Sequence, residues 1–206
     1  MDIAEKVLRQ KKDFDDVYEA GRKAEYDAFW DVYQNNGSAK GYSYAFAGQA
    51  WKDAVYNPKY DIVINYTAAY MYYDTRITDT KIVIDLANGS GSRTTSYMFG
   101  SATSLVTILK LIVSSTTPFS NTFHNCPELV NLIIVGTIGQ NGFDVHWSTK
   151  LSADSLKSII DALSTTTTGL TITLPTTAQS NYEAVYGSGS WSTLTATKSN
   201  WTIAYA

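Results

Sequence analysis

The sequence predicts an α+β protein in which an N-terminal coiled-coil helix precedes a short leucine-rich-repeat solenoid with atypical end caps. The main observation is a near-repetition, because segment 97–105 corresponds to segment 121–129, 24 residues later. Each copy precedes an alternating apolar stretch, at 109–113 and at 132–136. One strand per unit, with a period in the twenties, is typical of leucine-rich repeats that stack to bury their apolar edges. The matched pairs are Phe99 with Phe123, Ala102 with Cys126, and Leu105 with Leu129.

The second observation is the helical pattern of residues 2–34, which contain no proline and only one glycine. Alternating steps of four and three residues define a narrow seam with one polar member, as in a coiled coil. We expect this helix to self-associate, with a trimer favoured; the alternative is one amphipathic helix lying on its own domain. The expected oligomerisation residues are Ile3, Val7, Gln10, Phe14, Val17, Gly21, Ala24 and Ala28.

Composition excludes several classes of protein. The chain has 206 residues, is 44% hydrophobic, and carries a net charge of −3, which argues against a disordered chain and against a nucleic-acid binder. The single cysteine, Cys126, provides neither a disulfide framework nor a zinc ligand set. No stretch resembles a secretory signal or a membrane span, so we expect folding in the cytoplasm and no membrane partner.

The chain divides by composition into four expected parts: a helical stalk (1–37), a Tyr-rich linker and N-terminal cap (38–75), the solenoid (76–175) and a C-terminal cap (176–206). The tyrosines of the second part are interpreted as a cap, or alternatively as a sugar-binding surface, since tyrosine rings stack on pyranose faces. Further elements are expected as strands at 61–65, 81–85, 170–174 and 201–205, a helix at 151–163 capped by Ser152, and a short helix or turn at 176–186.

No catalytic constellation is recognisable, so we expect no enzyme, no cofactor and no metal. His124 and His146 lack metal-ligand spacing, and no nucleophile motif is present. Asp144 and His146 are expected to form an exposed loop pair, and Cys126 to be a buried thiol. The residues expected to form a ligand surface, should one exist, are Tyr97, Asp144, His146 and Trp147.

Several segments resemble a known family. Residues 123–129 (FHNCPEL) are similar to the F-x-N-C-x-x-L turn of BspA-like leucine-rich repeats. Residues 17–37, 136–151 and 196–203 resemble tail-associated or structural virion proteins of phages and prophages from gut Firmicutes. The resemblance implies a virion location, assembly inside the host cytoplasm, and other virion proteins as partners.

These expectations favour a non-enzymatic virion structural protein of the tail, baseplate or head appendage, which assembles through its N-terminal helix and displays its repeats, with a bacterial surface glycan as a candidate ligand. One alternative is an adhesin-type binding module of the bacterial cell surface, which would need a signal sequence and a wall anchor. Another is a glycan-cleaving enzyme, which would need a pair of carboxylates in a cleft.

Overall fold

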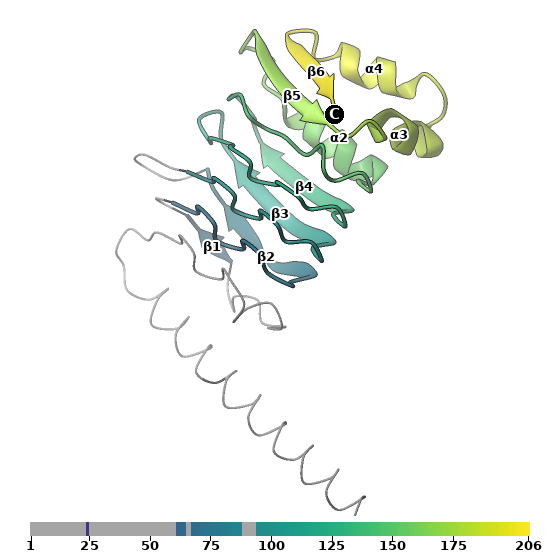
Figure 1. Ribbon diagram of the computed structural model, residues 1–206. Helices are drawn as coiled ribbons and strands as arrows, with labels where there is room; N and C mark the ends of the chain where they lie inside the picture. Colours follow the sequence, from purple (N-terminus) through teal and green to yellow (C-terminus); the bar gives the residue numbers. More distant parts are fainter. Residues whose placement is uncertain (1–23, 25–60, 65–66, 88–93) are drawn as a thin grey trace, which may run out of the picture. The chain divides into compact units, whose positions relative to one another are not determined.

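The computed structural model describes residues 24, 61–64, 67–87 and 94–206 (Figure 1). The chain divides into two units, Met1–Ser38 and Ala39–Ala206, and nearly all described residues belong to the second. The expected stalk, its oligomerisation residues other than Ala24, and the Tyr-rich segment up to residue 60 therefore lie outside the described residues. Ala24 itself is helical and exposed.

Four parallel strands form the main sheet, in the order in which they occur along the chain (Figure 1). Alternating apolar residues bury one face of each central strand, as in β3, where Ile108, Leu111 and Val113 are buried. The strands are β1 (Ile62–Val63), β2 (Asp79–Asp85), β3 (Thr107–Val113) and β4 (Asn131–Gly136). The strands expected at 81–85, 109–113 and 132–136 are thereby confirmed, and the one expected at 61–65 is shorter than predicted.

The residue correspondences behind the predicted repeat are confirmed in the core. The Phe99 and Phe123 rings stack with centroids 5.8 Å apart and planes 7° from parallel. Tyr72 stacks on the other side of Phe99 (5.4 Å), and Phe143 follows Phe123 (5.5 Å). These four buried rings form a column through successive turns, in which aromatic contacts add to the apolar area buried.

The expected fold class, however, is wrong: the described residues form a small α+β fold with three helices and two separate parallel sheets, not a leucine-rich-repeat solenoid. The spacing of paired residues is not constant, which a regular repeat would require. It is 22 from Ile62 to Ile84 and 28 from Asp79 to Thr107, and only then 24, from Thr107 to Asn131. The main sheet then ends at β4.

The main sheet ends because α2 (Ala153–Ala162) covers the edge of β4 with two serine hydroxyls. Leu132 N–H donates to Ser155 Oγ (2.8 Å), which in turn donates to the Val130 carbonyl (3.0 Å). Ile134 N–H donates to Ser158 Oγ (2.8 Å). The hydroxyls thus take the place of a further strand, and a sheet edge covered in this way cannot pair with another chain.

Helix α2 has the N-cap and the buried face that the sequence predicts, and it is shorter than the predicted 151–163. Ser152 caps it, accepting a hydrogen bond from the Ser155 N–H (3.3 Å). Its apolar residues recur at helical spacing and are all buried, at Leu156, Ile159, Ile160 and Leu163.

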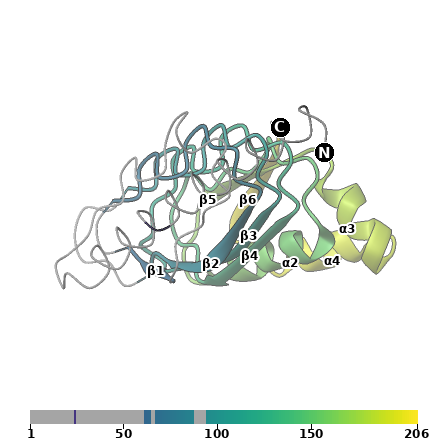
Figure 2. The same ribbon diagram turned by 90° about the horizontal axis from the view of Figure 1, so that it is seen from below.

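The C-terminal segment builds its own two-stranded parallel sheet, from β5 (Leu170–Leu174) and β6 (Trp201–Tyr205), with two helices between the strands. Figures 1 and 2 show these helices beside α2, at the end of the main sheet. The sequence predicts α3 (Ala178–Tyr186) but misses α4 (Ser190–Ala196), because a Gly/Ser-rich run is normally read as a loop.

Three side chains of the 196–203 segment fasten the end of α2 and the loop that follows it. Lys198 Nζ donates to the carbonyls of Asp161 (3.0 Å) and Leu163 (2.6 Å), where a cation also stabilises the negative end of the helix dipole. Asn200 Nδ2 and Trp201 Nε1 both donate to the Ser164 carbonyl (2.8 Å each). This part of the sequence therefore has a structural role.

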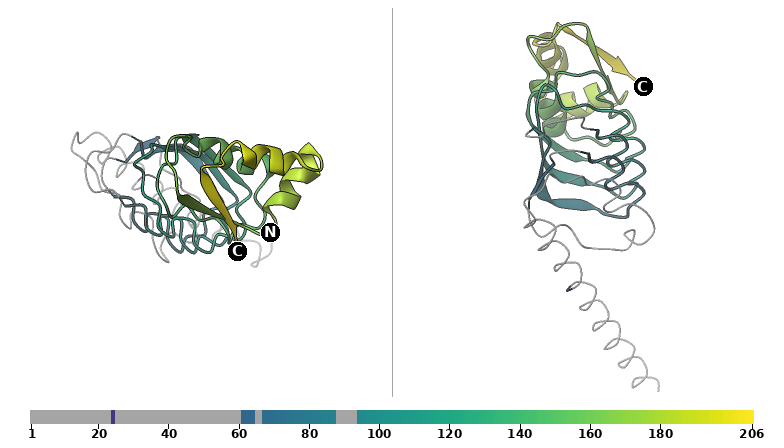
Figure 3. Two further views of the ribbon diagram at one scale, coloured as in Figure 1. Left: turned by 90° about the horizontal axis from the view of Figure 1, so that it is seen from above. Right: turned by 90° about the vertical axis from the view of Figure 1, so that its left-hand side faces the viewer.

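The glycines of the 136–151 segment permit close approach between successive turns (Figure 3). Gly136 and Gly142 have φ of 107° and 91°, which favours glycine. A Cβ on Gly142 would lie 2.1 Å from the Phe119 carbonyl oxygen, and one on Gly136 would lie 1.9 Å from that of Val113. Only a residue without a side chain fits at these positions.

Candidate functional site

The most prominent exposed feature of the described residues is a continuous row of ring contacts, here called the aromatic ridge. Its rings come from successive turns: two lie between β1 and β2, one between β2 and β3, one between β3 and β4, and two between β4 and α2. All six side chains are at least partly exposed. The members, in order of contact, are Tyr73, Tyr70, Tyr97, His124, Trp147 and His146.

The geometry changes along the aromatic ridge. Tyr70 and Tyr97 stack almost face to face, with centroids 5.2 Å apart and planes 11° from parallel. Each ring therefore gives one face to the other. Beyond Tyr97 the contacts become edge-to-face, to His124 (5.6 Å, 72°) and then to Trp147 (5.4 Å, 72°). The indole of Trp147 is 43% exposed, so this end of the ridge offers the more accessible aromatic surface.

The two stacked tyrosines occupy strained backbone. Tyr70 has φ of 57° and Tyr97 of 52°, in the left-handed region that bulky residues rarely adopt. The corresponding position in the next turn, Asn121, also has φ of 52°, and asparagine tolerates that conformation well. Tyrosine at these positions costs about 1–2 kcal/mol each. Strain retained beneath an exposed surface feature is a reason to suspect a function for that feature.

A rigid loop holds the Trp147 end of the ridge. Asp144 Oδ1 accepts from the His146 backbone N–H (3.0 Å) and from its Nδ1 (2.6 Å). Val145 N–H donates to the Thr173 carbonyl (3.0 Å), which ties the loop to β5. Ser148 Oγ donates to the Cys126 carbonyl (3.0 Å). Val145 and Ser148, which precede and follow the His146–Trp147 pair in the sequence, are both buried. The loop is thereby ordered before any ligand binds, which lowers the entropic cost of binding.

The structure brings together all four residues expected to form a ligand surface. Tyr97 contacts Trp147 through His124, and Asp144 and His146 lie in the same loop as Trp147. Their role in binding stays a prediction. The sequence gives no signal for His124 as a member of this surface, and it places Tyr70 and Tyr73 in the Tyr-rich segment, whose alternative interpretation is a sugar-binding surface. The 27-residue separation of Tyr70 from Tyr97, at matching backbone positions, is the signal that connects the two groups.

Cys126 is buried, as expected, and lies beneath the ridge rather than in it. Its Sγ donates to the Phe99 carbonyl (3.0 Å). Burial raises the pKa of the Cys126 thiol to about 12. The thiol is therefore protonated at neutral pH and is a poor nucleophile.

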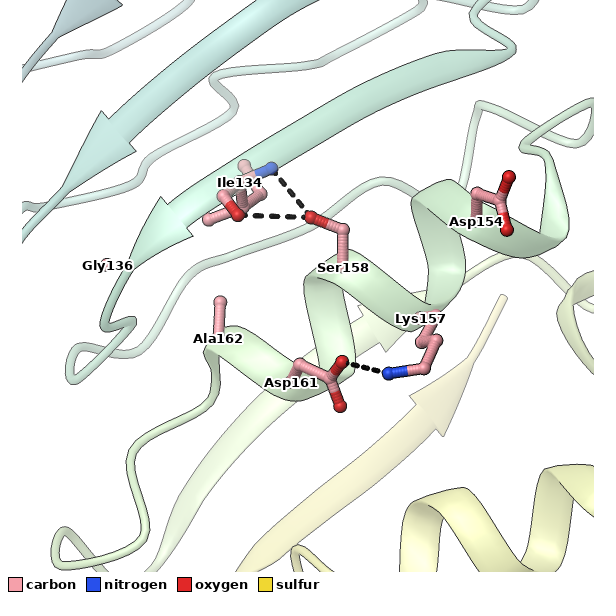
Figure 4. Close-up of a pocket in the computed structure, with 7 residues that line it drawn as sticks. All are labelled: Ile134, Gly136, Asp154, Lys157, Ser158, Asp161 and Ala162. Atoms are coloured by element: carbon pink, nitrogen blue, oxygen red, sulfur yellow. Dashed lines mark hydrogen bonds and ion pairs between the residues drawn. The ribbon is translucent and has the colours of Figure 1, made fainter.

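Another surface feature of the described residues is a groove of about 390 Å³ between the end of β4 and α2 (Figure 4). Its polar groups are largely engaged with protein partners. Lys157 forms an ion pair with Asp161, whose hydrogen bond raises the pKa of the lysine. Tyr186 Oη donates to Asp154 Oδ1 (2.6 Å), and this bond raises the pKa of the tyrosine. The groove offers fewer uncommitted polar atoms than the ridge does.

The described residues contain no group of three or more His, Cys, Asp or Glu side chains arranged to hold a metal ion. No helix in that part of the chain is long and apolar enough to cross a membrane. No family model, curated protein or solved structure matches this chain.

Proposed function

We propose that this protein is a non-enzymatic structural component of a phage virion, in the tail, the baseplate or a head appendage. In this proposal residues 1–37 assemble the chain as a homo-oligomer, with a trimer favoured, and attach it to other virion proteins. The second unit then meets glycans of the host surface. The virion location is supported by the likeness of residues 17–37, 136–151 and 196–203 to virion proteins.

The observation that carries the binding part of the proposal is the aromatic ridge. Tyrosine, histidine and tryptophan side chains combine an apolar ring with a polar tip, which suits the alternating C–H and hydroxyl surfaces of sugars. The strained conformations of Tyr70 and Tyr97 argue that this row of rings is retained for more than stability.

The virion location is tested by locating the protein. Particles purified from the bacterium that carries the gene should contain the protein by mass spectrometry, and immunogold labelling should place it at a fixed site on the particle. An adhesin would label the cell surface instead, in cells that release no particles. Absence from purified particles would overturn the proposal.

The assembly role is tested by light scattering on the full chain. We expect a defined oligomer that dissociates in a full-length variant carrying both Val7→Asp and Val17→Asp, because charges in a coiled-coil seam oppose association. The matched control makes the same change in charge at two neutral positions outside the seam, Ala4→Asp and Tyr18→Asp. A wild-type monomer would remove this part of the proposal.

A further inference from the structure

The Trp147 end of the aromatic ridge carries several polar atoms that have no protein partner within the described residues. They are the indole Nε1–H of Trp147, Nε2 of His146, Oδ2 of Asp144 and both ring nitrogens of His124. By contrast, the indole N–H groups of Trp191 and Trp201 are both hydrogen-bonded, to Tyr205 Oη and the Ser164 carbonyl (2.8 Å each). The polar atoms at this end are thus available to a ligand.

We infer that the Trp147 end is a subsite for one uncharged pyranose ring of a glycan. The C–H face of the sugar stacks on the exposed indole, the type of contact that aromatic side chains make with partly apolar ligands. The sugar hydroxyls donate to Asp144 Oδ2 and to His146 Nε2, and accept from Trp147 Nε1–H. The hydrogen bond between His146 Nδ1 and Asp144 fixes the tautomer that leaves Nε2 as an acceptor.

Charge decides which sugars the subsite accepts. The carboxyl group of Asp144 beside the indole accepts hydrogen bonds from neutral hydroxyl donors and disfavours phosphate or carboxylate groups at the same place. The nearest cation in the sequence, Lys150, forms an exposed ion pair with Glu128 (2.6 Å), which reduces the positive charge it offers to an anionic ligand. The subsite therefore favours neutral glycans over polyanionic ones such as glycerol-phosphate polymers.

The stacked tyrosines have a different part in this inference. Tyr70 and Tyr97 each give one face to the other, so these two faces are not open to a sugar. They belong to the part of the ridge that continues from the Trp147 subsite through His124. The inference rests on the proposed function only for the source of the glycan, which is the host surface.

The test follows the indole N–H signals of the full chain, labelled with ¹⁵N-tryptophan, during titration with chitotetraose or cellotetraose. The Trp147 signal, assigned by its loss in Trp147→Phe, should shift with the concentration of at least one of these neutral probes. The signals of Trp191 and Trp201 should stay in place because their N–H groups are bonded within the protein. A glycerol-phosphate oligomer should cause no shift.

Variants assign the effect to this subsite. Asp144→Asn keeps an oxygen for the His146 N–H but removes the charge, and should weaken binding about tenfold or more. Tyr186→Ala removes an exposed ring at the end of α3 that is not part of the aromatic ridge, so this variant should leave binding unchanged. An unshifted Trp201 signal in each variant shows that the fold is intact, whereas the Trp191 signal is not used for Tyr186→Ala because Tyr182 lies between the two rings.

Three results would overturn the inference: no Trp147 shift with either neutral probe, equal affinity in Asp144→Asn, or tighter binding of the anionic oligomer. Such a failure is separable from that of the proposed function. A protein that is found in virions but does not bind these probes keeps the proposed function and loses this inference, whereas a probe-binding protein absent from virions does the reverse.

Discussion

The stacked turns between β1 and α2 and the segment from α2 to the C-terminus both use parallel strands but satisfy their polar groups differently. In the turns, backbone groups bond to the equivalent groups of the next turn, as when Tyr72 N–H donates to the Met98 carbonyl (2.6 Å). In the C-terminal segment the backbones of β5 and β6 still pair, but side chains such as Ser155 and Lys198 also bond to backbone groups at the end of the main sheet and of α2. Stacking aligns like residues into rows, both buried and exposed, whereas the capped segment closes the sheet.

The comparison explains where the candidate site lies. Stacking sets successive side chains about 5–6 Å apart, so that four buried rings form a column and six exposed ones form the aromatic ridge. The C-terminal segment has a shorter row, in which Tyr182 contacts Tyr186 and Trp191, and Tyr182 and Trp191 are buried. Its exposed aromatics, Tyr186 and Tyr205, are each bonded to another side chain. Each of the following predictions separates the two kinds of stabilisation.

The largest effect is expected where two turns touch. Gly142→Ala should lower the free energy of unfolding by about 3–5 kcal/mol, because the new Cβ meets the Phe119 carbonyl in a left-handed conformation. Gly187 is the matched control, since its φ of 92° is almost the same as that of Gly142 but nothing lies within 4 Å. Gly187→Ala should cost about 1 kcal/mol. Equal losses in denaturant unfolding would show that contact between turns does not matter.

The next effect concerns the covered edge of β4. Ser155→Ala should cost about 1–3 kcal/mol, because the buried Leu132 N–H loses its partner, while the Val130 carbonyl keeps its second donor, the Ser152 N–H (2.9 Å). Ser192→Ala serves as the control, since the hydroxyl of Ser192 is exposed and bonds only within α4. Chemical denaturation of both variants measures the difference. A loss below 1 kcal/mol for Ser155→Ala would mean that the hydroxyl is not what ends the sheet.

A smaller, pH-dependent effect is expected at Cys126. Since burial raises its folded-state pKa to about 12, the unfolded chain loses the thiol proton first, at about pH 8.5. The stability that the protonated thiol contributes is therefore complete below about pH 8.5 and is lost as the pH rises toward 12.

Comparison with Cys126→Ala isolates this contribution, because tyrosines and lysines titrate in both proteins. The wild-type advantage in unfolding free energy should shrink by about 2 kcal/mol between pH 7.5 and pH 10. An advantage that stays constant with pH would contradict the burial of the thiol.

The smallest effect on stability is expected in the ridge itself. In Tyr97→Asn, relief of about 1 kcal/mol of backbone strain offsets the loss of the ring contacts, so stability should change by less than about 1 kcal/mol. The reverse change in the next turn, Asn121→Tyr, should destabilise by about 1–2 kcal/mol. Thermal unfolding of both variants decides this. A large loss in Tyr97→Asn would assign the ridge to stability rather than binding.

The sequence predicts the strands and α2 well because each has a strong local signal: alternation in β3 and β4, and a serine cap with helical apolar spacing in α2. It does not predict the fold class. The 24-residue match holds between β3 and β4 only, and nothing local shows that Ser155 and Ser158 would close the sheet. Helix α4 is missed because its Ser/Thr-rich residues are also common in loops.

The candidate site could be predicted in part. The Asp144–His146–Trp147 loop is recognisable because its chemistry lies within four consecutive residues. The contribution of His124, Tyr70 and Tyr73 depends on the register between turns, and the unequal spacing of the strands hides that register in the sequence.

The most direct test of the central claim, that stacked turns build a glycan-binding row, is binding of the full chain to cell walls isolated from the host. Co-sedimentation would compare wild type, Trp147→Ala, Tyr97→Asn and the control Tyr186→Ala. We predict that wild type and Tyr186→Ala bind alike and that Trp147→Ala binds at least about tenfold more weakly, with Tyr97→Asn between them. Equal binding by all four proteins, or no binding by wild type, would contradict the claim.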